Sequence, residues 1–581
     1  MQPVDFTTLT ASCAELRSDW LPARLEQVYQ CDRYTIALAL RTLDQRGWLM
    51  LSWHPQAARV CISDPPPRTP DTFTFSQQLR HQLGGLALTA IETIAPWERV
   101  IDLQFARRPG DPALWHLYVE IMGKYSNIIL TNQTNQVVTA AHQVSHQQSS
   151  VRTIQTGQPY DIPPTLTDPI PTLEEPQSRW QERISLIPDT LRRNLLKNYR
   201  GLSSALVLSM IQVADLDPEQ STDTLSLKEW QTLFDRWQEW LRALEREQFQ
   251  PGWLPQGGYT VMGWNRIRPE KTVQVLLNQY YRDRLNEQEF SQLRHQISQK
   301  LSHILKKLSV KAQDFRKRLS QSDQADQYRE QADLLMAYLH EWQPGMKQIA
   351  LLDFATGEPV NIPLNPEKNA VQNAQGLYKR HQKLKRSRFA LEPLLTEVQS
   401  EIDYLEQVEV AIAQLDRYHK PDDLASLTEI RDELIQQSYL DDPEQRYRSN
   451  TPQTTNFLRY RTPNGFEILI GRNNRQNDQL TFRLAGDYDL WFHTQEIPGS
   501  HVLLRLEPGT APDDTDLQFT ADLAAFYSRA RQSDRAPVVY TEPKQVFKPK
   551  GAKPGIAIYK QERVIWGEPQ RGREVVMKDE G

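Results

Sequence analysis

Two long helical patterns, each with an apolar stripe close to heptad spacing, constrain this fold more than any other feature. The first runs from about Val273 to Trp342, and its stripe has intervals of 4, 4, 3 and 4 residues: Leu293, Ile297, Leu301, Ile304 and Leu308. The second stripe consists of Leu391, Leu395, Val398, Ile402 and Leu405. A narrow stripe of this kind is typical of a helix that packs along a second helix.

A short strand-like segment separates the two patterns. IALLDFATGEPVNIPLN has β-prone ends around a turn at Thr356–Gly357, which would reverse the chain. Because few core-forming residues surround such long patterns, we predict a long antiparallel coiled-coil arm with a small tip over residues 271–445. Two ordinary helices inside a globule are the alternative.

Ahead of the arm, residues 1–175 have the pattern of an α+β domain. Helix-like and strand-like stretches alternate from Phe6 to about Tyr160. The segment LWHLYVEIMGKYSNIILTN has apolar, β-branched residues on both sides of a polar turn, which predicts a hairpin. The proline-rich stretch that follows, up to Pro176, supports neither a helix nor a central strand and indicates a domain boundary.

Residues 176–270 are expected to form a helical domain and then return to the first domain. In LRRNLLKNYRGLSSALVLSMIQVAD, Gly201 separates two amphipathic runs, as in a helix-hairpin-helix unit. Such a unit can hold a phosphate with its backbone amides. One tight turn needs only one glycine, so a simple packed helical pair is the alternative.

Strand patterns return in residues 446–569, where FLRYRTPNGFEILIGR predicts a hairpin around Pro463–Gly465. The sequence after Trp566 is polar, and residues 570–581 are expected to be a loose tail. The whole chain is therefore predicted to be an α+β multidomain protein, with its C-terminal α+β domain following the arm.

The overall charge excludes a general attraction to nucleic acid. Lys and Arg number 68 against 73 Asp and Glu, which gives a formal net charge of −5. RNA binding would therefore depend on local clusters of Lys and Arg. Because no basic leader and no run of about 18 apolar residues is present, we expect a cytoplasmic protein without a membrane span.

The sequence predicts no cofactor and no metal site. Cys13, Cys31 and Cys61 are the three cysteines, and none forms a CxxC pair. His493 and His501 are eight residues apart, and no cluster of Cys or His supplies further ligands. Neither GxxxxGK[ST] nor GxGxxG after a strand occurs, so no nucleotide-binding loop is expected.

Three basic or donor-rich clusters are candidates for RNA contact. The first lies in YKRHQKLKRSR on the second long helix, has no acids within it, and includes Lys379, Arg380, Lys383, Lys385, Arg386 and Arg388. We expect these cations to form an unneutralised face that could contact rRNA. A solvated helical surface is the alternative.

The second cluster is the loop YTEPKQVFKPKGAKPGIAIYK, whose prolines and glycines hold the backbone open. Its lysines can each meet a phosphate: Lys544, Lys548, Lys550 and Lys553. Such a concentration is unusual in an acidic chain, which favours RNA contact over a solvated loop.

The third cluster is a turn after a strand, rich in groups that can serve phosphate, ribose and base. Its candidate RNA-binding residues are Arg472, Asn473, Asn474, Arg475, Gln476, Asn477, Asp478, His493, Ser500 and His501. Trp491 and Phe492 could stack on bases, although Trp491 is the better candidate for the core. Asn477 and Asp478 could instead fix the turn.

With these residues in view, the chain resembles the NFACT family, which includes bacterial RqcH and eukaryotic nuclear export mediator factor. The run GRNNRQNDQLTF…DLWFHTQEIPGSHV and the loop YTEPKQVFKPKGAKPGIAIY are similar to the family's RNA-binding domain. EIMGKYSNIILT is similar to its N-terminal domain. The resemblance extends over nearly the whole chain.

The resemblance implies a function on obstructed ribosomes. Family members bind 50S subunits that carry peptidyl-tRNA, recruit tRNA, usually alanyl-tRNA in bacteria, and extend the stalled peptide without a template. The tail marks the peptide for degradation. The ribosome itself makes the peptide bond, so the resemblance implies a positioning factor and not an enzyme.

The resemblance also implies tRNA-binding residues in the N-terminal domain. The family uses an Asp–Arg pair, and the matching residues here are Glu98 and Arg99. Arg99 fits the pattern, whereas Glu98 is longer by one methylene and places its charge differently.

Three other functions are compatible with parts of the sequence. An RNA-binding factor without tailing activity and a fibronectin-binding surface adhesin remain alternatives, although the lack of a secretion signal disfavours the adhesin. Glycosylase chemistry of the formamidopyrimidine type needs a free proline amine, and Gln2 precedes Pro3, so neither this chemistry nor a DNA partner is expected.

Overall fold

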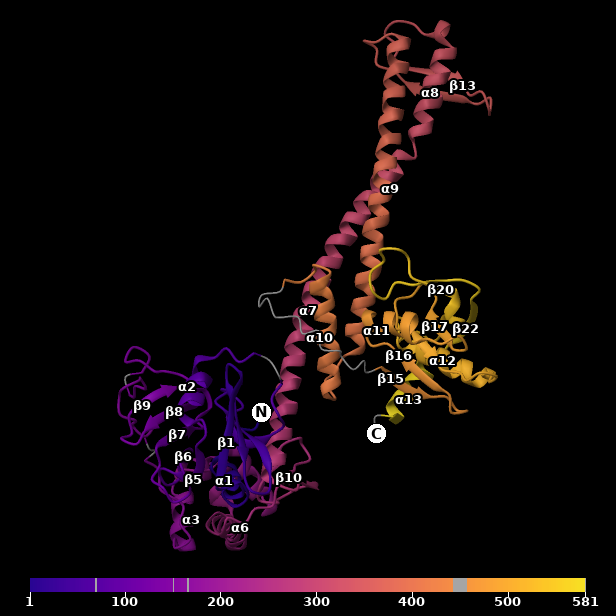
Figure 1. Ribbon diagram of the computed structural model, residues 1–581. Helices are drawn as coiled ribbons and strands as arrows, with labels where there is room; N and C mark the ends of the chain where they lie inside the picture. The colour runs from indigo at the N-terminus through magenta and orange to yellow at the C-terminus, as the bar shows by residue number, and fades with distance from the viewer. Residues whose placement is uncertain (68–69, 150, 165–166, 442–456, 580–581) are drawn as a thin grey trace. The chain divides into compact units, whose positions relative to one another are not determined.

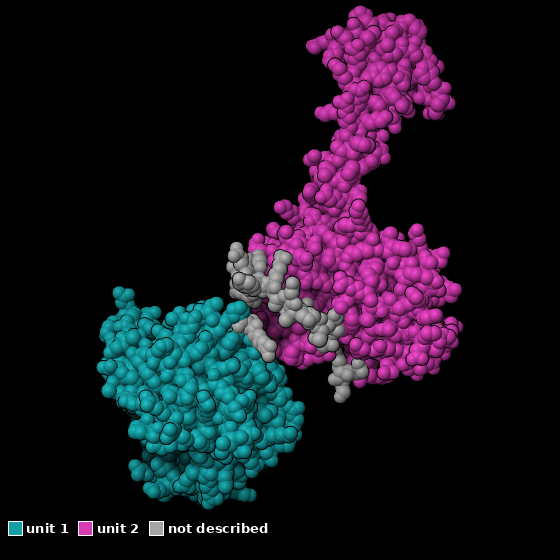
Figure 2. Space-filling model, in the orientation of Figure 1, with its two compact units in different colours: residues 1–285 teal, residues 286–581 magenta. Residues whose placement is uncertain are grey.

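The computed structural model describes residues 1–67, 70–149, 151–164, 167–441 and 457–579. The chain divides into two compact units, residues 1–285 and 286–581, which Figure 2 colours separately. In the part of the chain that the structure describes, no helix is long and apolar enough to cross a membrane.

A nine-stranded antiparallel sheet organises the first unit, in the order β4-β3-β2-β1-β5-β6-β7-β8-β9. Its strands are β1 (Ala23–Asp32), β2 (Thr35–Arg41), β3 (Arg46–Ser52), β4 (Arg59–Ser63), β5 (Ala87–Thr93), β6 (Val100–Ala106), β7 (Trp115–Glu120), β8 (Asn127–Asn132) and β9 (Val137–Ala140). The predicted hairpin is present as β7 and β8, which pair from Trp115↔Asn132 to Glu120↔Asn127. Helices α1 (Phe6–Trp20) and α2 (Thr74–Leu83) contribute to the same core.

The helical part of the first unit has a tryptophan-rich core of its own, which includes Trp180, Trp237 and Trp240. Its helices are α3 (Gln177–Ser185), α4 (Leu191–Asn198), α5 (Ser204–Val213) and α6 (Leu227–Arg246). After α6, Tyr259 packs into the core of the nine-stranded sheet. Tyr259 lies in the small sheet of β10 (Gly252–Trp253), β11 (Tyr259–Thr260) and β12 (Arg268–Pro269).

Two long helices pack together in the second unit: α7 (Val273–Ser322), which begins in the first unit, and α9 (Ala370–Gln414) (Figure 1). Leu301 shares a buried cluster with Leu405, and Ala312 shares one with Val398. The residue numbers of the contacts rise along α7 as they fall along α9, so the two helices are antiparallel. The coiled-coil character of this pair remains a prediction.

The helical pattern that we expected to continue to Trp342 is interrupted after Ser322, and a separate helix α8 (Ala325–Ala337) follows. The strand-like segment forms the hairpin β13 (Gln348–Leu352) and β14 (Pro359–Pro363). Gly357 has φ +69° in its turn, a conformation that glycine adopts without steric cost. Helix α10 (Pro421–Gln436) follows α9, and its Leu427 packs in the same cluster as Leu405.

A six-stranded antiparallel sheet forms the C-terminal region, in the order β15-β16-β18-β17-β19-β22. Its strands are β15 (Leu458–Arg461), β16 (Glu467–Ile470), β17 (Leu490–Thr494), β18 (Val502–Leu504), β19 (Ala536–Thr541) and β22 (Arg563–Gly567). The predicted hairpin corresponds to β15 and β16. Helix α11 (Asn474–Gln479) follows β16, helix α12 (Asp514–Phe526) packs on the sheet, and β20 (Val546–Phe547) pairs with β21 (Ile558–Tyr559).

The expected loose tail is largely a helix, so this prediction is wrong for residues up to 579. Helix α13 (Pro569–Asp579) packs on α12, with Val575 and Val576 against the core of the sheet. A Cβ at Gly572 would lie 2.6 Å from the Asp522 carbonyl oxygen, so the two helices approach closely there. The predicted domain boundary at 445/446 lies outside the described residues.

Candidate nucleic-acid interface

The donor-rich turn after β16 is folded into the interior. Asn473 caps α11 by accepting a 2.9 Å hydrogen bond from the Gln476 backbone amide. Arg472 is only 7% exposed, and its guanidinium donates to the Asp423 carboxylate and, at 3.3 Å, to the Asp422 carbonyl. The arginine therefore forms a buried ion pair with the first turn of α10.

The neighbouring amides also donate to acids of α10. Glu429 accepts from Asn473 at 2.6 Å and from Gln476 at 2.9 Å. Asn474 donates to Glu433 at 3.3 Å, and burial raises the pKa of that carboxyl group. These amide donors are used inside the protein.

Asn477 and Asp478 hold two other segments. The Asn477 side-chain oxygen accepts a 3.0 Å hydrogen bond from the His501 backbone amide. Asp478 accepts one from the Gly555 amide at 3.0 Å and forms an ion pair with Lys548. Asp478 thereby fixes both ends of the 548–555 loop on α11.

The four lysines of this loop region have different surroundings. Lys553 donates to the Tyr439 hydroxyl, and its ammonium lies 4.8 Å and 4.5 Å from the ring centroids of Tyr404 and Tyr439. Burial lowers the pKa of Lys553. Lys544 pairs with Glu542, which raises the Lys544 pKa. Lys544, Lys548 and Lys550 are exposed residues, and the Lys548 ammonium is directed to Asp478.

The aromatic run belongs to the core. Trp491 is buried and donates from Nε1 to Thr481 at 3.0 Å, and Thr481 lies 2.6 Å from His501 Nδ1. His493 stacks on Trp491, and desolvation lowers its pKa to about 4. The pKa of buried His501 is also lowered, chiefly by desolvation. Both imidazoles are therefore neutral at pH 7.

Ser500 is buried and donates to Gln414 of α9 at 3.3 Å. Phe492 is buried as well. The rings of His493 and His501 are 5.4 Å apart, and among the described residues no group of three or more His, Cys, Asp or Glu is arranged to hold a metal. This part of the cluster thus consists of packed and hydrogen-bonded groups.

In the first unit, Glu98 is buried and faces the turn between α4 and α5. Its carboxylate lies 3.5 Å from the Arg200 guanidinium. Trp97 covers Gly201, which has φ +81° and no room for a Cβ. Ser203 donates to Asp5 at 2.5 Å, so the helical turn is attached at three points. The predicted tRNA-binding turn and the predicted helix-hairpin-helix unit are therefore direct neighbours.

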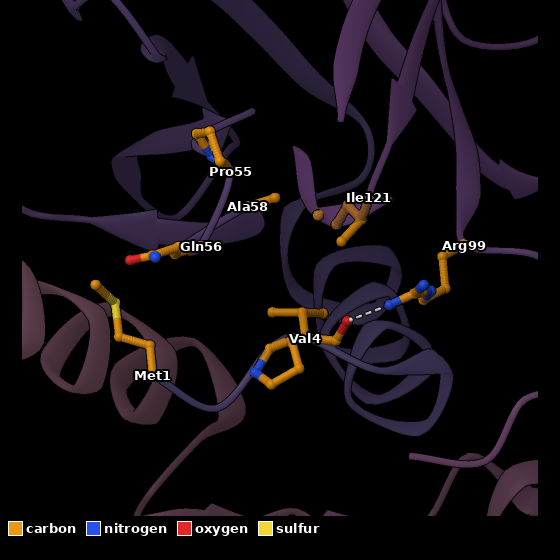
Figure 3. Close-up of a pocket in the computed structure, with 9 residues that line it drawn as sticks. Met1, Val4, Pro55, Gln56, Ala58, Arg99 and Ile121 are labelled. Carbon is orange, nitrogen blue, oxygen red and sulfur yellow. Dashed lines mark hydrogen bonds between the residues drawn. The ribbon is translucent and has the colours of Figure 1, made fainter. Parts of the chain in front are cut away.

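Arg99 lines a pocket of about 250 Å³ (Figure 3). It donates to the Val4 carbonyl at 3.3 Å, shown dashed in the figure. The rest of the lining comes from the first residues of the chain and two loops: Met1, Pro3, Val4, Pro55, Gln56, Ala58, Ile121 and Gly123. Glu98 and Arg99 are consecutive but face different surroundings.

The cations of the first cluster are exposed on α9: Lys379, Arg380, Lys383, Lys385, Arg386 and Arg388. Arg380 lies 4.6 Å above the Tyr328 ring. The expectation of an unneutralised face is wrong for Arg388, which pairs with Asp323 at 3.1 Å and with Glu392 at 2.8 Å. Glu392 is one helical turn away in the sequence, whereas Asp323 comes from beyond the end of α7.

Phe547, Ile558 and Lys560 are surface residues that our sequence analysis did not single out. Phe547 is 43% exposed and Ile558 is 50% exposed, and the two are paired across β20 and β21. Their alternation with buried Val546 and half-buried Tyr559 is the period-two signal that could have identified them.

Two family models match the chain. Residues 5–453 match the NFACT N-terminal and middle domains, and residues 456–560 match the NFACT protein RNA binding domain. Curated relatives named "Rqc2 homolog RqcH" come from Bacillus subtilis, with 29% identity over 97% of both chains, and from Streptococcus suis, with 30% identity over 97% of this chain and 98% of that one.

A solved C-terminal structure of the fibronectin/fibrinogen-binding protein from Streptococcus suis is also similar. It has 30% identity and a TM-score of 0.38 and covers 49% of this chain and 98% of that one. The family models together span nearly the whole sequence, as the resemblance predicted. This chain belongs to the NFACT family and carries its RNA-binding domain in the C-terminal region.

Proposed function

We propose that this protein is a cytoplasmic ribosome quality-control factor. It binds 50S subunits that carry stalled peptidyl-tRNA and recruits tRNA, alanyl-tRNA first of all, for template-free tailing that marks the nascent chain for degradation. The observation that carries the proposal is similarity to RqcH over 97% of the chain, together with the RNA-binding domain. The protein positions tRNA and leaves peptide-bond formation to the ribosome.

Within this proposal, the predicted RNA-binding residues have two roles. Lys544 and Lys550 meet rRNA phosphates, because they are exposed, whereas Lys548 holds the loop on α11 through Asp478. The buried side chains of this turn and the half-buried Asp478 hold the loop and α10 in place: Arg472, Asn473, Asn474, Gln476, Asn477 and Asp478. We assign a further rRNA contact to the basic face of α9, on a coiled-coil arm formed by α7 and α9.

The loop assignment can be tested by reversing charge. Lys544→Glu with Lys550→Glu should release the protein from 50S particles. The slope of log binding constant against log salt concentration should become shallower by the amount expected for the loss of about two phosphate contacts. Neither lysine ties the loop to α11, so folding should be preserved. Lys228→Glu with Lys271→Glu, which alters two exposed lysines of the first unit, is the matched control.

Equal co-sedimentation of both double variants would contradict the loop assignment. Recovery of the native protein on intact cell surfaces, and not in the ribosomal fraction, would contradict the whole proposal and support an adhesin.

The tRNA assignment rests on Arg99, whose guanidinium lines an open pocket and has one hydrogen bond, to Val4. Arg99→Ala should abolish tails on a stalled reporter and leave 50S binding unchanged. Arg99→Lys keeps the charge without the planar fork and should restore tailing only in part. Normal tails in the alanine variant would show that Arg99 does not hold tRNA.

A further inference from the structure

The small hairpin of β20 and β21 has one buried and one exposed face. Val546 is 6% exposed and packs with Trp491 and Val539, and its cross-strand partner Tyr559 packs against the same cluster. Because side chains alternate along a strand, Phe547 and Ile558 lie on the opposite face. An exposed phenylalanine beside an exposed isoleucine makes a flat apolar surface.

A cation lies beside this apolar surface. The Lys560 ammonium lies 5.7 Å from the Phe547 ring centroid, and the Lys560 backbone amide donates to Gln545 at 3.1 Å, which fixes the lysine next to the hairpin. Lys550 is exposed three residues after Phe547, whereas the Lys548 ammonium pairs with Asp478 on α11. A protein-binding apolar surface is usually depleted in lysine, whereas single-stranded nucleic acid is bound by aromatic rings flanked by cations.

We propose that the exposed face of the β20–β21 hairpin binds an unpaired nucleotide of RNA, with the base stacked on Phe547 and the adjoining phosphates near Lys560 and Lys550. The proposal rests on the proposed RNA-binding function and adds its substrate class, because a base inside a duplex cannot offer its ring face to a side chain. Ile558 covers the edge of the base. When the base stacks on Phe547, the Lys560 ammonium moves from the phenyl ring to the adjoining phosphate.

The test compares two RNA probes with the full-length protein: a fluorescent dodecauridylate and a blunt RNA duplex with the same number of phosphates. Phe547→Ala should weaken dodecauridylate binding about tenfold, the scale expected for the loss of one base–aromatic stack, and leave duplex binding unchanged. Phe547→Tyr should retain single-strand binding, because the ring is kept. Phe354→Ala, which removes another phenylalanine that is 66% exposed, is the matched control and should have no effect.

Three outcomes would overturn the inference: equal dodecauridylate affinity for Phe547→Ala and the unaltered protein, an equal loss for both probes, or no binding of dodecauridylate at all. The first would leave the face available to a protein partner. Failure of this inference is distinct from failure of the proposed function. If Phe547→Ala has no effect while Lys544→Glu with Lys550→Glu still releases 50S particles, only the stacking surface is wrong.

Discussion

Arg472→Ala tests whether the donor-rich turn is a scaffold or an RNA ligand. The side chains of Arg472 and Asp423 are each 7% exposed, so removal of the guanidinium leaves a buried carboxylate without its counter-ion. Breaking a buried ion pair in this way costs about 3–5 kcal/mol. Asp423 still accepts from the backbone amides of His419 and Lys420 at 2.9 and 3.0 Å. We therefore expect the lower end, about 3 kcal/mol.

Two measurements on the full-length protein report this loss of stability: thermal unfolding, and hydrogen exchange of the backbone amides in α10 and α11. About 3 kcal/mol should lower the melting temperature of the C-terminal region by about 10 °C. Arg475→Ala is the control, because Arg475 is half-buried and donates to the neutral Gln436 at 2.7 Å, and it should cost less than about 1 kcal/mol. If Arg472→Ala unfolds normally yet loses RNA affinity, the arginine contacts RNA and the argument from burial is wrong.

Three further changes probe other features. Gly201→Ala should destabilise the first unit by about 2 kcal/mol in thermal melts, because φ is +81° and Trp97 occupies the Cβ position. His493, with a pKa lowered to about 4, contributes stability above the unfolded pKa of about 6.5 that is lost as pH falls; its share of the loss in urea unfolding between pH 8 and pH 5 should be about 2 kcal/mol, and His493→Gln should remove that share and leave the share of His501. Val576→Asp should cost about 1–2 kcal/mol in urea unfolding, whereas a loose tail would tolerate it.

The parts of the fold that the sequence predicts correctly depend on local signals. The β7–β8 and β15–β16 hairpins have both strands and their turn within a single short segment, so alternation and turn residues suffice. Helix α13 could not be found in this way, because its contact with the core needs only two valines and a glycine. A mostly polar segment with only two valines cannot be distinguished from a loose tail until the surface that the valines cover is known.

The candidate site was harder to predict because its partners are distant in the sequence. Arg472 meets Asp423, and Asn473 meets Glu429, across 49 and 44 residues. A run of Arg and Asn looks the same whether it faces phosphates or carboxylates, since both are anionic oxygen acceptors. The acids of α10 stand at helical spacing in the sequence, but nothing local shows which segment they face.

Glu98 and Arg99 show why neighbouring residues in one motif need separate tests. Glu98 is buried against Arg200 and the turn that Arg200 anchors, whereas Arg99 lines the pocket itself. Because Glu98 and Arg200 form one buried pair, Glu98→Ala and Arg200→Ala should each weaken tailing and each lower the melting temperature of the first unit. Arg99→Ala should stop tailing at an unchanged melting temperature. If Arg200→Ala tails normally while Glu98→Ala does not, Glu98 contacts tRNA directly and the buried pair is not its means of action.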